Sequence, residues 1–567
     1  MKTLIILGTA CLALSATAQT PEAVKLTDKE QFEKATSAFK QLVAASPTSG
    51  ADWFYFGENY YANDRSDSAA ACYQRGIEVN STFPLNHAGM GKVLREGGKA
   101  DLAQAQFDQA VALATAKANK NSKQDIAATY REVAEGMLAG ATPDYAGALA
   151  MVQKGIDLYP KDPEAYILKG DAMFDQNPRD GSAPLENYKM AMQLDALNAK
   201  PVARKAFMYY RAKNFPSSIE EYTNAIALDP GFAPAYRGRA EAYFKARDFD
   251  KATADMQKYL ELNVGNTSAR VRNAQFLFLV KKYDESLTEI QALEAEGVQN
   301  MTLKRLKAFD LEEKGEHMAA DSALNAYFAE QPDEKEISVD FEYAAKIDQS
   351  LSKLQAADTL STAPRMAYDS LAGEMYLKAV QMEPSKDYLY VEAAKAFTDG
   401  RAYDKAIAAM KLKTAENPEV NDWYYLGAMA SRAKRYALAD SAWAAYIAKQ
   451  PNIYQGYLYR ARAQAGMDSA EVKSWTALPY YQDVIRKMKP EEVDSHKADL
   501  EEAYNYMGLY FLYNTTDMDR AKAKCWFEKV STLNAGTSIT QQVNETFLKM
   551  KELKGVEAAP CELAPAP

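Results

Sequence analysis

The feature that most constrains this chain is an internal repeat with a period of about 34 residues. The stretches Trp53–Gly57 and Trp423–Gly427 each contain an aromatic residue, an apolar residue three positions on, and then glycine. The second stretch continues to Trp443 and ends at Pro451. A period of this length is typical of a unit of two helices that buries its apolar face only by stacking on its neighbours.

The spacing persists where the residues themselves change. Small, aromatic and proline residues stand at matching offsets in the intervening units, among them Tyr236, Ala252, Ala274, Ala308, Pro332, Ala394, Ala406 and Pro418. Small residues such as Gly57 and Ala69 let the two helices of a unit approach closely, and large ones such as Tyr73 fill the remaining space. A proline after the second helix ends it, because proline cannot continue the hydrogen-bond ladder.

This pattern resembles the tetratricopeptide repeat (TPR), whose W-x₂-L-G-x₂-Y…A-x₃-F…P signature has the same order and spacing. The resemblance covers nearly the whole chain and implies an all-α fold, a right-handed α-solenoid of about thirteen or fourteen stacked helix-turn-helix units. Only 27 glycines and 22 prolines among 567 residues also favour helices over many-turned β architectures.

The units are not uniform, and their irregularities predict the domain organisation. The first unit is expected to lack its leading helix, because Ala35, Phe39 and Pro47 match only the second half of the pattern. We predict an N-terminal TPR array (residues 19–346), an inserted helical segment (347–371) and a C-terminal TPR array (372–536). A capping helix (537–554) and a disordered Pro/Ala-rich tail (555–567) are expected to follow.

The first 18 residues read as a secretory signal peptide. Lys2 gives a positive start, Leu4–Leu14 is a short apolar run, and Ala16-Thr17-Ala18 is a small-x-small cleavage site. We expect export to the periplasm or cell envelope, with lipidation at Cys11 the lesser alternative because Gly8 stands where an aliphatic residue is required. No later apolar run reaches the length of a membrane span.

Three cysteines follow the signal segment, and their pairing is open. Cys72 lies in an amphipathic pattern and is expected to be a small buried apolar residue. Cys561 lies in the tail and is expected to be exposed, while a Cys525–Cys561 bridge is possible but not readable from the sequence.

The residues offer no catalytic constellation. Three histidines stand far apart without metal-ligand spacing, and Gly89-Met90-Gly91-Lys92 lacks the spacer of a phosphate loop. The surplus of 77 acidic over 67 basic residues argues against nucleic acid as a partner. We therefore expect no enzyme activity and no cofactor or metal, and a scaffold that binds partner proteins or peptides.

The resemblance to TPR arrays implies that the first helix of each unit lines a concave groove. At these offsets the middle units carry a basic and aromatic strip: Lys200, Arg204, Tyr210, Arg211, Arg237, Phe244, Lys245, Arg272 and Phe278. Arginine forks suit carboxylates, so an acidic peptide is one expected ligand. The alternative is that these cations only solvate a helix face.

The later units carry tyrosines at the corresponding offsets: Tyr424, Tyr425, Tyr459 and Tyr506. Tyrosine-rich surfaces bind peptides and also stack on sugar rings, so an envelope glycan or peptidoglycan is the alternative ligand. Packing between units is the simpler explanation, because aromatic residues at helical spacing are usually core.

Six Asp-Ser/Thr-apolar triplets, such as Asp321-Ser322-Ala323 and Asp440-Ser441-Ala442, resemble acceptors for O-glycosylation of exported proteins in some Gram-negative bacteria. Helix capping explains the same residues, since Asp and Ser are preferred where helices begin.

Overall fold

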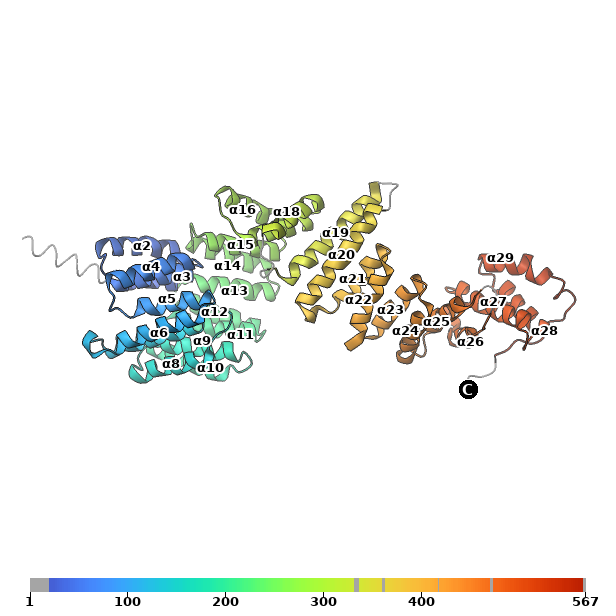
Figure 1. Ribbon diagram of the computed structural model, residues 1–567, viewed down its shortest axis with the longest axis horizontal. Coiled ribbons are helices and arrows are strands. Elements are labelled where there is room, and N and C mark those ends of the chain that lie inside the picture. The colour runs from blue at the N-terminus through green and yellow to red at the C-terminus, as the bar shows by residue number, and fades with distance from the viewer. Residues whose placement is uncertain (1–19, 331–335, 359–362, 417, 470–472, 564–567) are drawn as a thin grey trace, which may run out of the picture. The chain divides into compact units, whose positions relative to one another are not determined.

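The computed structural model describes residues 20–330, 336–358, 363–416, 418–469 and 473–563, which contain helices and no β-strand. The predicted signal peptide, residues 1–18, lies outside this range. The chain divides into two compact units, Met1–Leu306 and Lys307–Pro567, which are considered separately below (Figure 1). In both units leading helices, which carry odd numbers up to α27, alternate with trailing helices, which carry even numbers, and pairs such as α3 with α4 and α23 with α24 pack against each other.

The first unit begins with helical residues 20–28. Its further helices are α2 (Phe32–Ala45), α3 (Gly50–Ala62), α4 (Ser66–Val79), α5 (Leu85–Glu96), α6 (Ala100–Thr115), α7 (Lys123–Met137), α8 (Tyr145–Leu158), α9 (Pro163–Gln176), α10 (Ser182–Leu194), α11 (Ala199–Arg211), α12 (Phe215–Leu228), α13 (Ala233–Lys245), α14 (Phe249–Leu262), α15 (Thr267–Leu279) and α16 (Tyr283–Ala295). Helix α17 (Met301–Glu313) runs across the division.

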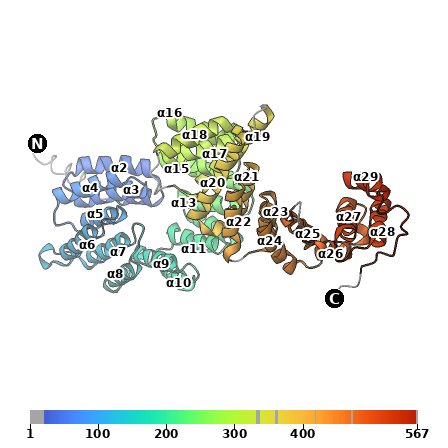
Figure 2. The ribbon, with the colours of Figure 1, turned by 45° about the vertical axis from the view of Figure 1, so that its right-hand side comes forward.

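The second unit continues the alternation. Its helices are α18 (His317–Glu330), α19 (Ser338–Asp358), α20 (Ala363–Met382), α21 (Leu389–Asp399), α22 (Tyr403–Glu416), α23 (Val420–Arg432), α24 (Tyr436–Lys449), α25 (Tyr454–Met467), α26 (Leu478–Lys487), α27 (Lys497–Tyr513), α28 (Arg520–Leu533) and α29 (Ser538–Glu545). Figure 2 shows α23 to α28 following one another in chain order.

The two helices of a pair approach closely where a glycine of the leading helix faces a ring of the trailing helix. A Cβ atom at Gly57 would lie 2.3 Å from the ring of Tyr73, and one at Gly427 would lie 2.6 Å from the ring of Trp443. Both rings are at most 1% exposed. The predicted role of the small residue, to let the helices meet, is confirmed at these positions.

The aromatic residue that opens the repeat pattern has a polar role as well. Trp53 Nε1 donates a hydrogen bond of 3.0 Å to the carbonyl of Pro47, and Tyr457 donates one of 3.0 Å to Pro451. Tyr166 and Tyr236 donate in the same way to Pro160 and Pro230, always six residues back. The hydrogen bond ties these four leading helices to the turns that end the preceding trailing helices, which explains why aromatic and proline residues recur together there.

The first unit has the leading helix that the sequence pattern did not show. Residues 20–28 are helical and pack through Ala23, which is 1% exposed, beside α2 and α3. Thr27 Oγ1 donates to Asn59 Oδ1 at 3.0 Å and Thr20 Oγ1 donates to Asp52 Oδ1 at 2.8 Å. This helix lacks the aromatic-x₂-apolar-Gly sequence, and that is why the pattern missed it.

The predicted insertion, residues 347–371, lengthens one helix pair. It falls on the second half of α19, which has 21 residues, and the first half of α20, which has 20, while residues 359–362 between them lie outside the described range. The division between the compact units falls earlier, between Leu306 and Lys307.

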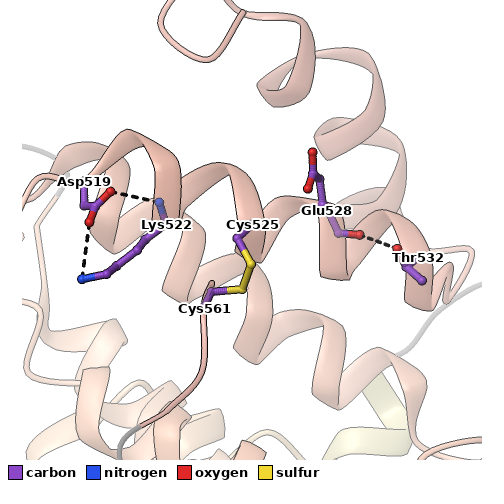
Figure 3. The surroundings of a disulfide bond; sticks show 6 residues. All are labelled: Asp519, Lys522, Cys525, Glu528, Thr532 and Cys561. Carbon is purple, nitrogen blue, oxygen red and sulfur yellow. Dashed lines mark hydrogen bonds and ion pairs between the residues drawn. A yellow bond between two sulfur atoms is a disulfide. The ribbon is translucent and has the colours of Figure 1, made fainter. Parts of the chain in front are cut away.

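The tail was expected to be disordered, but residues 556–561 pack on α28. Cys561 is 4% exposed and forms a disulfide with Cys525 of α28 (Figure 3). Lys524 Nζ donates to the carbonyl of Val556 at 2.6 Å, and the Ala559 amide donates to the carbonyl of Ala521 at 3.2 Å. The expectation of an exposed Cys561 is therefore wrong, because these bonds and packing against Trp526 hold residues 556–561 on α28. Cys72 is buried and unpaired, as expected, and burial raises its pKa to about 12.

We predict that Gly427→Ala destabilises the second unit although alanine favours helices. The new Cβ would overlap the buried ring of Trp443, so we expect the free energy of unfolding to fall by about 1–3 kcal/mol in urea titrations followed by circular dichroism. Gly97→Ala is the control, since its Cβ would meet only the carbonyl oxygens of Val93 and Leu94, at 3.5 and 3.6 Å. A gain in stability at position 427 would contradict the role given to this glycine.

We predict that alkylation of the unfolded, unreduced protein labels Cys72 and leaves Cys525 and Cys561 unlabelled, as read by peptide mass mapping. Loss of the bridge in Cys561→Ser should lower the free energy of unfolding by about 2–4 kcal/mol, because the crosslink restricts the unfolded chain. Cys72→Ser is the control that retains the bridge. Labelling of both Cys525 and Cys561 in the parent protein would show that the bridge does not form.

Candidate functional site

The first unit closes on itself through contacts between its beginning and its later repeats. Lys29 lies 2.9 Å from Asp229, and Arg237 of α13 lies 2.9 Å from Glu30. Between them, Gln31 Nε2 donates to the carbonyl of Gly231 at 2.8 Å. Figures 1 and 2 both show the blue helices α2 to α4 beside the green helices α13 to α15, which are far along the chain.

A second set of contacts lies one repeat further along. Asn266 Nδ2 donates to Asn63 Oδ1 at 2.9 Å, and both residues are at least 95% buried. Arg272 of α15 lies 3.0 Å from Asp64. We call these two sets of contacts the clasp. Both join residues about 200 positions apart, so one turn of the superhelix packs on the next, and we call this turn the ring.

The clasp and the ring interior account for the cations of the predicted basic strip. Lys200 lies 2.7 Å from Glu164 and 3.5 Å from Asp28. Arg204 lies 2.9 Å from Asp171, while Arg237 and Arg272 belong to the clasp. Burial alone would lower the pKa of Lys200, but the neighbouring carboxylates hold this pKa above its ordinary value. These four cations already have acidic ligands, and the ligands come from the same chain.

The other residues of the strip contact aromatic rings. Tyr210 stacks on Phe207 at 6.2 Å, and the Arg211 guanidinium lies 5.7 Å from the same ring. Phe244 contacts Phe276 at 6.3 Å, Lys245 is exposed beside Phe244, and Phe278 contacts Tyr283 at 5.8 Å. The use of this strip as one binding site stays a prediction.

A cavity of about 430 Å³, partly open to solvent, lies inside the ring. Its wall is formed by the segment 24–32 and the leading helices α3, α7, α9 and α11. Seven carboxylates and three cations line it: Asp28, Glu30, Glu58, Glu132, Glu135, Glu164 and Asp171, with Arg131, Lys200 and Arg204. A volume of this size is ordinary for a small-ligand site.

Lys92, beside this cavity, is the most deeply buried cation of the first unit. Its side chain is 2% exposed, and Nζ lies 2.6 Å from Glu58, 3.3 Å from Glu135 and 4.5 Å from the ring of Tyr61. Burial opposes its charge, but the carboxylates outweigh burial and raise the pKa of Lys92. The Gly-Met-Gly-Lys stretch is thus part of an internal ion-pair network.

The carboxylates of the ring are the residues that sequence reasoning missed. They stand at the groove offsets of the early repeats, as the basic strip does in the later ones. The acidic early repeats and basic late repeats could have indicated these ion pairs, but only if it were known that the two sets of repeats are in contact.

In the second unit the predicted tyrosines form two groups. Tyr424 lies 5.4 Å from Trp443 and 6.1 Å from Tyr459, so these rings join α23, α24 and α25. Tyr425 has Lys395 of α21 5.1 Å from its ring. Tyr506 of α27 packs on Tyr481 at 4.5 Å, and its hydroxyl is buried without a hydrogen-bond partner among the described residues. All four side chains are half-buried, so packing between repeats occupies part of each ring.

A row of polar contacts joins the leading helices of the second unit. Arg462 of α25 lies 2.6 Å from Glu502 of α27 and 5.8 Å from the ring of Tyr459. Arg462 is 42% exposed and Lys395 is 41% exposed. We call Lys395, Tyr425, Tyr459, Arg462 and Glu502 the leading-helix face of the second unit.

Within the described residues, no three His, Cys, Asp or Glu side chains are placed to hold one metal ion. No described helix combines the length and the apolarity needed to cross a membrane.

Comparison with known proteins found similarity to solved TPR structures. No family model and no curated protein matches the chain. The C-terminal part of a TPR repeat-containing protein from Cytophaga hutchinsonii is 27% identical, with 48% of this chain and 98% of that chain covered and a TM-score of 0.36. A tetratricopeptide repeat protein from Parabacteroides merdae is 19% identical, with 46% and 93% covered and a TM-score of 0.33. Yeast Tom70 is 11% identical, with 74% and 97% covered and a TM-score of 0.37.

The recurrent helix pairs of the chain itself define its class, an α-solenoid protein built from TPR-like units.

We predict that Arg237→Glu opens the clasp, because it sets a carboxylate against Glu30 and Glu241. The pair is partly exposed, so we expect a loss of about 1–3 kcal/mol in unfolding free energy and faster hydrogen exchange in residues 20–31. The charge swap Arg237→Glu with Glu30→Arg should restore most of the protection. Arg75→Glu, which affects only an exposed pair with Glu78, is the control. Unchanged exchange in Arg237→Glu would contradict the closed ring.

Proposed function

We propose that the chain is a non-enzymatic scaffold that binds partner proteins or peptides on the leading-helix face of the second unit. The observation that carries the proposal is the combination of charged groups and tyrosine rings along the leading helices of this unit. Lys395 pairs with Glu392 and Arg462 pairs with Glu502, yet both cations remain about two-fifths exposed beside tyrosine rings.

The chemistry of this face suits a protein partner. Arginine and tyrosine are the residues that most often dominate binding energy at protein interfaces, because they combine large contact area with hydrogen-bonding groups. Glu502 and Asp499, both 25% exposed, add negative charge next to Arg462, so the face offers both signs of charge to a mixed polar surface.

We further propose that the protein acts outside the cytoplasm, in the bacterial envelope. The signal-like residues 1–18 support export, and the Cys525–Cys561 bridge supports an oxidising compartment, where disulfides persist. Recovery of the protein from the envelope fraction without residues 1–18, by cell fractionation and intact mass, is the expected result. Recovery from the cytoplasm at full-length mass would contradict export.

In-cell crosslinking followed by mass spectrometry tests the scaffold. We expect reproducible crosslinks from one partner protein to Lys395 and neighbouring lysines. The double variant Tyr425→Ala with Arg462→Ala should reduce partner recovery at least about tenfold, equivalent to 1.4 kcal/mol.

The matched control is Arg435→Ala, which removes an arginine that is 60% exposed and pairs with Asp404. Equal recovery with the double variant and the control would reject the leading-helix face as the site. Recovery without any protein partner, together with retention on a peptidoglycan affinity matrix, would favour glycan binding instead.

A further inference from the structure

The clasp contacts of the first unit differ in kind from the contacts between neighbouring helix pairs. Neighbouring pairs share apolar clusters, and the clusters around Phe39 and Tyr73 extend no further than Val93. The cluster around Tyr222 begins at Met192. The clasp, in contrast, consists of ion pairs and hydrogen bonds. Successive turns of the superhelix are therefore joined by contacts that depend on charge, whereas neighbouring pairs are joined by burial of apolar surface.

The ion pair between Arg237 and Glu30 leaves two buried polar atoms unsatisfied. The pair has one hydrogen bond, from Arg237 Nη2 to Glu30 Oε1 at 2.9 Å. Arg237 Nε and Glu30 Oε2 are buried and have no hydrogen-bond partner among the described residues. A buried polar atom without a partner costs free energy relative to the same atom in water. Opening the clasp admits water to both atoms and so offsets part of the loss of the ion pair.

The other ion pairs of the clasp are exposed enough to be screened by salt. Lys29 and Asp229 are 30% and 25% exposed, and Arg272 and Asp64 are 31% and 69% exposed. Ion pairs in contact with solvent contribute little stability, and their contribution falls as the ionic strength rises. The closed clasp therefore depends on ion pairs that are both weak and sensitive to salt.

We propose that the clasp is an ionic latch, which opens and closes while the helix pairs on both sides stay folded. In the closed form described here, residues 28–31 lie against the inner cations, and Lys200, Arg237 and Arg272 are paired with carboxylates of the early repeats. In the open form these cations and the lining of the ring cavity are accessible. Ionic strength thus controls access to the inner face of the first unit. The latch does not depend on the leading-helix face of the second unit.

Hydrogen exchange of the full chain, followed by mass spectrometry, tests the latch. Raising NaCl from about 0.1 M to about 1 M shortens the screening length from about 10 Å to about 3 Å. We expect exchange in residues 20–31 to become at least about threefold faster, while exchange in α3 and α4 stays unchanged because apolar contacts hold this pair. Unchanged exchange in residues 20–31 would overturn the proposal. Equal acceleration in α3 and α4 would also overturn it, because the repeats themselves would then be unfolding.

A crosslink across the latch separates its opening from other effects of salt. The variant Lys29→Cys with Asp229→Cys replaces an ion pair of 2.9 Å by two thiols that a bis-maleimide reagent can join. The substitution Cys72→Ser removes the free thiol of the parent chain, and the two remaining cysteines form the disulfide. The crosslinked protein should show no acceleration by salt in residues 20–31, and the same variant without the reagent should show it. Equal acceleration in both would overturn the latch.

Modification of Lys200 measures access to the inner face. Its side chain is 27% exposed and pairs with Asp28 and Glu164. Acylation of Lys200 by an N-hydroxysuccinimide ester, read by peptide mass mapping, should become faster at high salt in the parent protein but not in the crosslinked variant. Lys189 is the control, because it is 50% exposed and pairs with Glu186 on the same helix. An acceleration at Lys200 no larger than that at Lys189 would contradict the opening of the inner face.

The variant Asp64→Asn tests the latch by charge alone. Asparagine tolerates the left-handed backbone at position 64, where φ is 59°, so the change removes the ion pair with Arg272 without straining the turn. We expect residues 20–31 to reach their fast exchange at a lower NaCl concentration than in the parent protein. Glu78→Gln is the matched control, because its ion pair with Arg75 lies within one helix. The same salt response in both variants would overturn the assignment of the latch to the clasp.

Discussion

Close contact between a glycine of a leading helix and a ring of a trailing helix is the constraint on which the architecture depends. At Gly57 and Gly427 the space for a side chain is already taken by the buried rings of Tyr73 and Trp443. Each contact fixes the distance between the helices of a pair, and the aromatic-to-proline hydrogen bond fixes where the next pair begins. Because the same contacts recur within a unit, the same small rotation recurs, and the row of helix pairs in that unit curves.

Curvature brings residues that are far apart in the sequence into contact, so charged residues that meet must carry opposite charges. Glu30 meets Arg237 and Asp64 meets Arg272 across about 200 positions of the chain. Early repeats of the first unit contribute acidic side chains to the inner face and later repeats contribute basic ones. The basic strip therefore has a partner within the molecule, and its first role is to close the ring.

Features that depend on contacts between residues close in the sequence could be predicted, whereas features that depend on contacts between distant residues could not. The repeat, the close approach at Gly57 and the burial of Cys72 depend on local spacing, and the sequence predicted them. The clasp depends on rotations summed over several helix pairs, which no residue pattern records. The helix at residues 20–28 and the course of the tail escaped prediction for a different reason. Neither carries the repeat signature, and each is held by particular contacts, at Ala23 and at Cys561.

The two units use the same kind of surface in different ways. In the first, closing the ring costs desolvation of Lys92, Glu132 and their neighbours, and such buried ions rarely repay that cost in stability alone. Apolar residues at the same positions would fill the interior with less electrostatic penalty. In the second unit Lys395 and Arg462 also have carboxylate partners, but both side chains stay about two-fifths exposed, so their ion pairs cost less desolvation. The same repeat thus carries a buried ion-pair network around Lys92 in the first unit and partly exposed ion pairs in the second.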